Sequence, residues 1–261
     1  MERPFNVWHG DNMPVQAPFY KSPSIPYGCK NMKSLDVFCR ARKGVLKEYL
    51  AHTPFEYISD NFLISFGDYA NGTSAVYHDI GIVVPVRYKD LYGGYYLFEY
   101  EDLASSVAAG RELWGYPKKV ADFDVKEYEG RFNVNVSREA HTIINICAED
   151  TADTLQIPEN LYHPHLLLYT MPRYGGPGIQ FQKILKRDTS PDYVVIEKKF
   201  MRADVDISTY INPPVLEPWG DLKPEEVYGA VYGIGDFSAT HEHGWAELVD
   251  ITIPDQDYAP K

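Results

Sequence analysis

Short runs of β-branched and aromatic residues, separated by turn residues, recur along this chain of 261 residues and limit what it can fold into. Runs of this composition are typical of β-strands. The 19 glycines and 19 prolines agree with frequent turns, and Glu129-Gly130 lies between two runs as a hairpin turn would. The sequence therefore predicts strands over 62–66, 75–86, 95–100, 121–127, 131–136 and 142–148.

Helical patterns are fewer and cover 43–51, 101–113 and 224–232. The predicted strands do not alternate regularly with helices, which favours an α+β, mainly antiparallel β architecture over a doubly wound parallel sheet. No Ser/Gly-rich linker, repeat or low-complexity stretch divides the chain. We therefore expect a single domain over 1–261, in which 1–26 form an N-terminal extension.

The charge of the chain argues against nucleic acid as a partner, because 25 Lys and Arg against 37 Asp and Glu give a formal net charge of −12. No apolar run approaches the ~18 residues that a membrane span needs, so we expect no membrane association. The first four residues lack the apolar region of a signal peptide. Cys29, Cys39 and Cys147 are widely spaced. These features favour a reducing cytoplasm.

Two adjacent lysines, Lys118 and Lys119, follow a proline at the end of a predicted helix. Gly115 and Pro117 are expected to stop that helix. Pro117 also restrains the backbone on either side of it, so the lysines leave the helix in a defined direction. A defined direction is what a positioned nucleophile requires and a surface charge does not.

A lysine amine attacks a carbonyl group only when it is unprotonated, and its ordinary pKa of about 10.4 leaves it charged at neutral pH. Desolvation and a neighbouring positive charge both lower that pKa. A neutral amine condenses with a ketone to give a protonated Schiff base, which is an electron sink. Such a site supports loss of CO2 from a β-keto acid, retro-aldol cleavage, or proton removal next to the carbonyl.

The segment 110–119, Gly-Arg-Glu-Leu-Trp-Gly-Tyr-Pro-Lys-Lys, closely resembles the acetoacetate decarboxylase family. Segments 77–86, 97–102 and 171–176 resemble further blocks of that family in the same order, so that the resemblance covers about 27–254. It implies a closed, cone-like β-barrel with an internal cavity and a few surface helices. It also implies a homo-oligomer.

Carried onto this chain, the resemblance makes Lys118 the Schiff-base nucleophile and Lys119 the neighbour that lowers its pKa. Asp79 falls where the family has a catalytic glutamate. Arg111 and Glu112 match the motif and are expected to hold the helix end.

The chain departs from the family at two places. The family's carboxylate-binding arginine of the N-terminal strand aligns near Met32, where Lys30 and Lys33 are the only nearby cations. A second family glutamate has no counterpart in 62–68, where Asp68 is the one candidate. We expect substrate contacts from Tyr27, Met32, Trp114 and Tyr116, all on the basis of position.

The default function is a Schiff-base-forming lyase that decarboxylates an acetoacetate-like β-keto acid without a metal or organic cofactor. One alternative is a Schiff-base aldolase-dehydratase or cyclase acting on a larger keto compound. A second is a hydratase or isomerase in which Lys118 is only a base. A third is a non-enzymatic barrel that binds a hydrophobic or aromatic metabolite, which the 21 tyrosines fit.

Other motifs favour structural roles. His241-Glu242-His243 lacks a spaced third ligand, so solvated loop histidines are expected in place of a metal site. His163 and His165 flank Pro164 and are expected in a loop or interface. The 175–178 segment is too rich in proline for a phosphate loop and is expected to be a turn.

Overall fold

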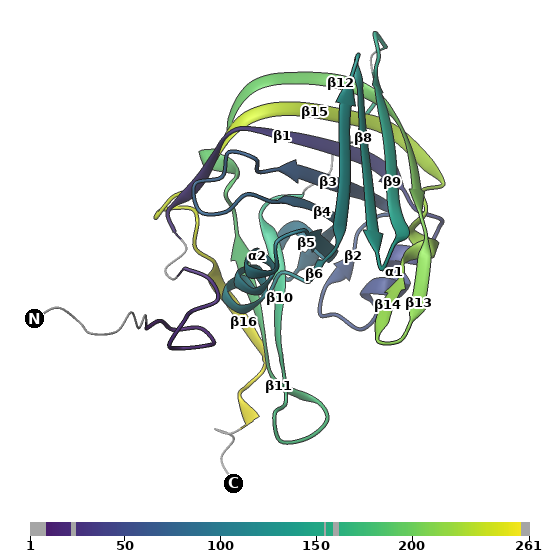
Figure 1. The fold of residues 1–261 in the computed structure, drawn as a ribbon. Helices are drawn as coiled ribbons and strands as arrows, with labels where there is room; N and C mark the ends of the chain where they lie inside the picture. Colours follow the sequence, from purple (N-terminus) through teal and green to yellow (C-terminus); the bar gives the residue numbers. More distant parts are fainter. Residues whose placement is uncertain (1–8, 22–24, 154, 159–161, 257–261) are drawn as a thin grey trace, which may run out of the picture.

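The fold is described from a computed structural model, in which residues 9–21, 25–153, 155–158 and 162–256 are placed. One large sheet curves around a central core, and a few short helices accompany it (Figure 1). Its strands are β1 (Tyr27–Arg40), β2 (Glu56–Tyr57), β3 (Asn61–Asp68), β4 (His78–Tyr88), β5 (Leu91–Glu101), β6 (Lys118–Val120), β7 (Asp122–Tyr128), β8 (Arg131–Arg138), β9 (His141–Asp150), β10 (His165–Pro172), β11 (Ile179–Arg187), β12 (Val194–Ile207), β15 (Glu226–Ala239) and β16 (Glu247–Ile253).

A separate hairpin pairs β13 (Thr209–Asn212) with β14 (Val215–Pro218). The helices are α1 (Val45–Leu50) and α2 (Ala104–Ala109), and α2 continues into a π-helical turn, Gly110–Trp114. Two 3₁₀ turns cover Ser190–Asp192 and Trp219–Leu222. No helix in the described part of the chain is both long enough and apolar enough to cross a membrane.

The pairing order is β16-β11-β10-β5-β4-β3-β1-β15-β12-β9-β8-β7. β6 pairs in parallel with β5, and after Ala121 the chain continues as β7, which pairs with β8. Nearly every other pairing is antiparallel, so the predicted mainly antiparallel class is confirmed. The closed, cone-like form stays a proposal, because no pairing of β16 with β7 is found among the described residues.

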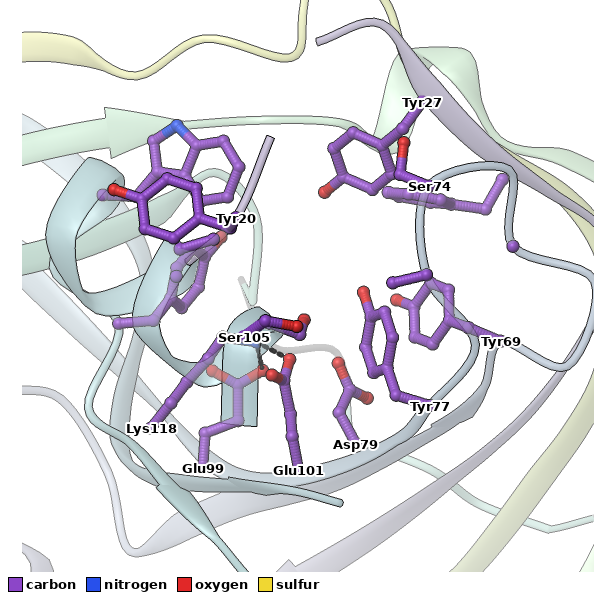
Figure 2. A pocket seen from close by; sticks show the side chains of 18 of the residues that line it. Tyr20, Tyr27, Tyr69, Ser74, Tyr77, Asp79, Glu99, Glu101, Ser105 and Lys118 are labelled. Atoms are coloured by element: carbon purple, nitrogen blue, oxygen red, sulfur yellow. Dashed lines mark hydrogen bonds and ion pairs between the residues drawn. The ribbon is translucent and has the colours of Figure 1, made fainter. Parts of the chain in front are cut away.

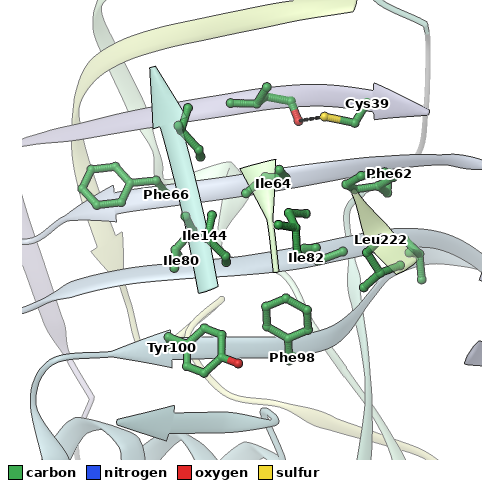
Figure 3. Packing of buried hydrophobic residues seen from close by; sticks show 14 of the residues in the cluster. Cys39, Phe62, Ile64, Phe66, Ile80, Ile82, Phe98, Tyr100, Ile144 and Leu222 are labelled. Carbon is green, nitrogen blue, oxygen red and sulfur yellow. Dashed lines mark hydrogen bonds between the residues drawn. The ribbon is translucent and has the colours of Figure 1, made fainter. Parts of the chain in front are cut away.

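Alternation of buried side chains explains why the central strands form. Phe62, Ile64 and Phe66 of β3 are fully buried and share one face, as the two-residue period of a strand requires. They pack against Ile80 and Ile82 of β4 in the core beneath the curved sheet (Figure 3). The six predicted strands therefore exist, within a few residues of their predicted limits.

One predicted helix is wrong. Residues 224–232 run into β15, which is hydrogen-bonded between β1 and β12. Pairing on both sides from Ala230 to Gly235 satisfies the backbone groups there, and this outweighs the local helical spacing. The predicted turn at Glu129-Gly130 is confirmed: both residues have positive φ, 43° and 77°, and join β7 to β8.

Candidate active site

The turn after α2 sets the direction of Lys118. Gly115 ends the π-helical turn with a φ of 76°, and the chain then enters β6 through Pro117. β6 lies beside β5 with Lys118 opposite Glu99 and Lys119 opposite Tyr100. Successive strand residues point to opposite faces, so only one of the two lysines faces the cavity.

Lys118 is that lysine. Its side chain is 8% exposed, and its Nζ donates to Glu99 Oε1 at 2.9 Å and also to Glu101 Oε1 (Figure 2). Glu99 and Glu101 are two residues apart on β5 and therefore share a face. Gly110 makes room for the lysine, because a Cβ at that position would lie 2.5 Å from both Cδ and Cε of Lys118.

Asp79 completes a cluster of three carboxyl groups. It lies on β4 directly opposite Glu101, and oxygens of Asp79, Glu99 and Glu101 lie within 4.8 Å of one another. Burial raises the pKa of Asp79 well above its ordinary range, and the charge of Glu99 raises it further. Burial also raises the pKa of Glu99. Glu99 Oε2 and Glu101 Oε2 are buried and find no donor among the described residues.

The same carboxyl groups control the lysine. Burial lowers the pKa of Lys118, but the charges of Glu101, Glu99 and Asp79 together outweigh burial and raise it well above its usual value. Lys119 takes no part in this balance. Its Nζ donates to Glu217 Oε2 and to the Leu216 carbonyl, each at 2.8 Å, on the other side of β6. The expected effect of Lys119 on the pKa of Lys118 therefore has no direct contact between the two amines behind it, and it stays a prediction.

These groups form the floor of a cavity of about 360 Å³. Tyr27, Trp114 and Tyr116 line it, as expected. Met32 does not: it is buried on β1 opposite Gly235, outside the lining residues, so its predicted substrate contact is corrected. Asp68 is also absent from the lining; it accepts from the amide of Ala70.

Sequence reasoning missed a buried cation in the cavity wall, Arg187 at the end of β11. Its guanidinium carbon lies 4.3 Å from the centre of the Trp114 ring. Nε donates to the Gly244 carbonyl at 2.8 Å, while Nη1 and Nη2 donate to the hydroxyls of Tyr116 and Tyr27 at 3.3 and 3.2 Å. Burial lowers the pKa of Arg187, but Tyr27 and Tyr116 raise it overall, so it is always charged.

A neutral histidine extends this network. His165 Nδ1 is hydrogen-bonded at 2.9 Å to the Tyr116 hydroxyl, which also accepts from Arg187. Burial lowers the pKa of His165 well below its ordinary value, and nearby His163 and Arg187 lower it further. The predicted loop position of His165 is corrected, since it lies in β10 and lines the cavity.

The predicted N-terminal extension also reaches the cavity. Phe19, Tyr20 and Lys21 line it, and Asn12 holds this segment by accepting from the amides of Phe19 and Tyr20. The Tyr20 hydroxyl donates to Glu112 Oε2 at 2.8 Å.

Two residues of the 110–119 motif make hydrogen bonds that involve backbone carbonyl groups. Arg111 donates to the Lys118 carbonyl, and the Glu112 carbonyl accepts from the Tyr169 hydroxyl. Both contacts agree with the expected structural roles.

The remaining motifs lie apart from this site. His243 pairs with Asp192 at 2.9 Å, and His241 lies in the turn after β15. Within the described ranges, Asp79, Glu99 and Glu101 form the one group of three metal-type ligands, and the Lys118 ammonium is hydrogen-bonded to two of them. The 175–178 segment is the turn between β10 and β11, as predicted.

Comparison with known proteins gives consistent matches. The family model for acetoacetate decarboxylase matches residues 12–247. Acetoacetate decarboxylase 3 of Mesorhizobium japonicum is 34% identical over 133 residues, which are 48% of this chain and 47% of that protein. The match therefore spans about half the length of this relative.

Solved structures share the fold. The crystal structure of acetoacetate decarboxylase from Legionella pneumophila has a TM-score of 0.77 and 20% identity, covering 92% of both chains. The enduracididine biosynthesis enzyme MppR with bound HEPES has a TM-score of 0.67 and 14% identity, covering 94% of this chain and 92% of that one. At these identities the likeness shows the fold alone.

Proposed function

Because the chain belongs to the acetoacetate decarboxylase family, we propose that it is a lyase that forms a Schiff base with a keto acid through Lys118. One observation carries the proposal: a single buried lysine reaches the cavity floor and is hydrogen-bonded to two carboxyl groups, with Asp79 beside them. A structural lysine needs no open cavity in front of its amine. A keto acid as substrate, a homo-oligomer and a cytoplasmic location are parts of the same proposal.

The first chemical step is local proton transfer. Lys118 carries a raised pKa and cannot lose its proton to solvent readily at neutral pH. Glu99 accepts a hydrogen bond from Nζ, and its own raised pKa makes it a stronger base than an ordinary glutamate. A proton that moves from Nζ to Glu99 leaves a neutral amine next to a neutral acid, a pair that suits a buried site.

The neutral amine then attacks the carbonyl carbon, and loss of water gives the protonated Schiff base. This cation accepts the electron pair of the breaking C–C bond. With a β-keto acid, CO₂ leaves and an enamine remains, whose carbon takes a proton. Asp79 supports this last role, because its raised pKa favours the protonated form that can donate. Hydrolysis returns the ketone and the Lys118 amine.

Decarboxylation of an acetoacetate-like acid is the default reaction, in line with the names of the matched relatives. A Schiff-base aldolase-dehydratase or cyclase acting on a larger keto compound is the second candidate. The cavity favours that alternative by its size, because pockets of about 300 Å³ and more hold ligands of many more atoms than acetoacetate.

Borohydride trapping tests the proposal. The protein is incubated with a panel of ketones and keto acids, reduced, and measured by intact mass. Lys118→Gln and Lys119→Gln form a matched pair, because the two lysines are adjacent but face opposite sides of β6.

We expect adducts in the wild type and in Lys119→Gln, and none in Lys118→Gln. No adduct in the folded wild type with any compound would refute the covalent mechanism. It would favour acid–base chemistry by Lys118, or a non-enzymatic binding cavity.

A further inference from the structure

We propose that Arg187, together with the Tyr27 hydroxyl, is the receptor for the substrate's carboxylate; this rests on the proposed function and defines its substrate as a keto acid bound in one orientation. The starting observation is an unbalanced charge. Arg187 is 6% exposed and always protonated, yet no ion pair is found for it among the described residues. Its three hydrogen-bond partners are neutral oxygens.

A buried cation without a counter-ion is costly, and an anion that enters the cavity removes that cost. Arg187 lines the cavity, so a ligand can reach it. Stacking on Trp114 fixes the plane of the guanidinium. A planar fork of donors held in one orientation matches the two oxygens of a carboxylate.

Tyr27 and Tyr116 differ in the hydrogen bonds that their hydroxyls can still make to a ligand. The Tyr116 hydroxyl is hydrogen-bonded to His165 Nδ1 and accepts from Arg187, so it already has two partners. The Tyr27 hydroxyl accepts from Arg187 and donates to no acceptor in the described chain. It points into the cavity (Figure 2), so its hydrogen is available to the ligand that Arg187 attracts.

The receptor and the nucleophile are the two poles of the proposed binding mode, and both lie near the Tyr116 ring. Lys118 Nζ is 5.2 Å and Arg187 Cζ is 5.9 Å from the centre of that ring, so the two cations are at most about 11 Å apart. One small molecule can reach both. Three carboxyl groups surround Lys118 and none pairs with Arg187, so an entering carboxylate is repelled at one pole and attracted at the other. This directs the carbonyl group to Lys118.

The test separates anion binding from catalysis. Lys118→Gln removes the covalent step and the cation at the cavity floor, and provides the background for titration calorimetry. The probes are 4-methylpentanoate and its neutral isostere 4-methylpentanamide. We expect the carboxylate to bind at least about tenfold more tightly than the amide, and the ratio to fall to about one when Arg187→Gln is added.

Two milder variants cover the case in which Arg187→Gln fails to fold. Arg187→Lys keeps the charge without the fork, and Tyr27→Phe removes one donor. We expect both to lower the ratio by about threefold or more. An unchanged ratio in these folded variants would overturn the proposal. Loss of trapping with normal carboxylate preference would instead refute only the Schiff-base function, so the two failures are distinguishable.

Discussion

Replacing Gly110 by alanine should slow the reaction by about 100-fold without unfolding the protein. Gly110 has ordinary helical dihedrals, with φ −61° and ψ −40°, so alanine is compatible with its backbone. The added Cβ would lie 2.5 Å from Cδ and Cε of Lys118, whereas carbon atoms in contact normally stay about 3.5–4.0 Å apart. The lysine must therefore move by about 1 Å.

That movement takes Nζ away from its hydrogen-bond partner Glu99, because Cε and Nζ are bonded. A displacement of about 1 Å of a reacting group costs about 100-fold in rate. Alanine in place of a helical glycine adds about 0.5–1 kcal/mol of stability, which offsets part of the steric cost. We therefore expect the loss to appear in the rate and not in the folding transition.

The assay is the rate of borohydride-trapped adduct formation with a keto acid that labels the wild type, together with a urea unfolding curve. Gly175→Ala is the matched control, because nothing lies within 4 Å of a Cβ at that position. Wild-type trapping rates in Gly110→Ala would refute the idea that the α2 end positions the lysine. So would an equal loss in Gly175→Ala.

Three further outcomes are expected. The rate should fall on acidification at a higher pH than the ordinary carboxyl range of about 4, because Glu99 must be a carboxylate to take the proton of Lys118, its pKa is raised, and that carboxylate form is lost as pH falls through the pKa. A pH–rate profile of the wild type and of Glu99→Gln, in which this limb should be absent, checks this. Glu217→Ala should lower the free energy of unfolding in urea by about 2 kcal/mol or more, with little effect on trapping. The reason is that this buried carboxylate lies outside the cavity and accepts hydrogen bonds from Lys119, Tyr100 and Trp219. A variant as stable as the wild type would contradict this. Tyr20→Phe should raise KM a few-fold at constant kcat, because it removes the hydrogen bond from the Tyr20 hydroxyl to Glu112 that holds the N-terminal segment at the cavity. An unchanged KM would show that this hydrogen bond does not order the cavity wall.

Local patterns predicted the parts of the fold that local physics determines. The prediction of β3, β4 and β5 as strands was correct, because their buried positions alternate or are continuous within one segment of sequence. β15 did not, because its position between β1 and β12 depends on residues about 200 and 30 positions away in the sequence. No periodicity within 224–232 carries that information.

The same division holds for the site. The Lys118 motif is contiguous and was found directly. Arg187 lies on β11 and His165 on β10, 69 and 47 residues further along the chain than Lys118, and they enter the cavity only through sheet pairing. Glu99 and Glu101 share one face of β5, but the sequence prediction ended the strand at 100 and placed Glu101 in the following helix, so their alternation was not recognised.

The placement of Lys119 changes the source of the neutral amine. The sequence-based hypothesis lets the charge of Lys119 lower the pKa of Lys118, so removal of that charge should move the active pH range upward. In the structure the Lys119 ammonium is paired with Glu217 across β6, and the groups that act on Lys118 are three carboxyls. The amine is then freed by proton transfer within the cluster, and Lys119→Gln should leave the pH–rate profile unchanged. An upward shift of the pH–rate profile in this variant would show instead that the charge of Lys119 helps to set the pKa of Lys118.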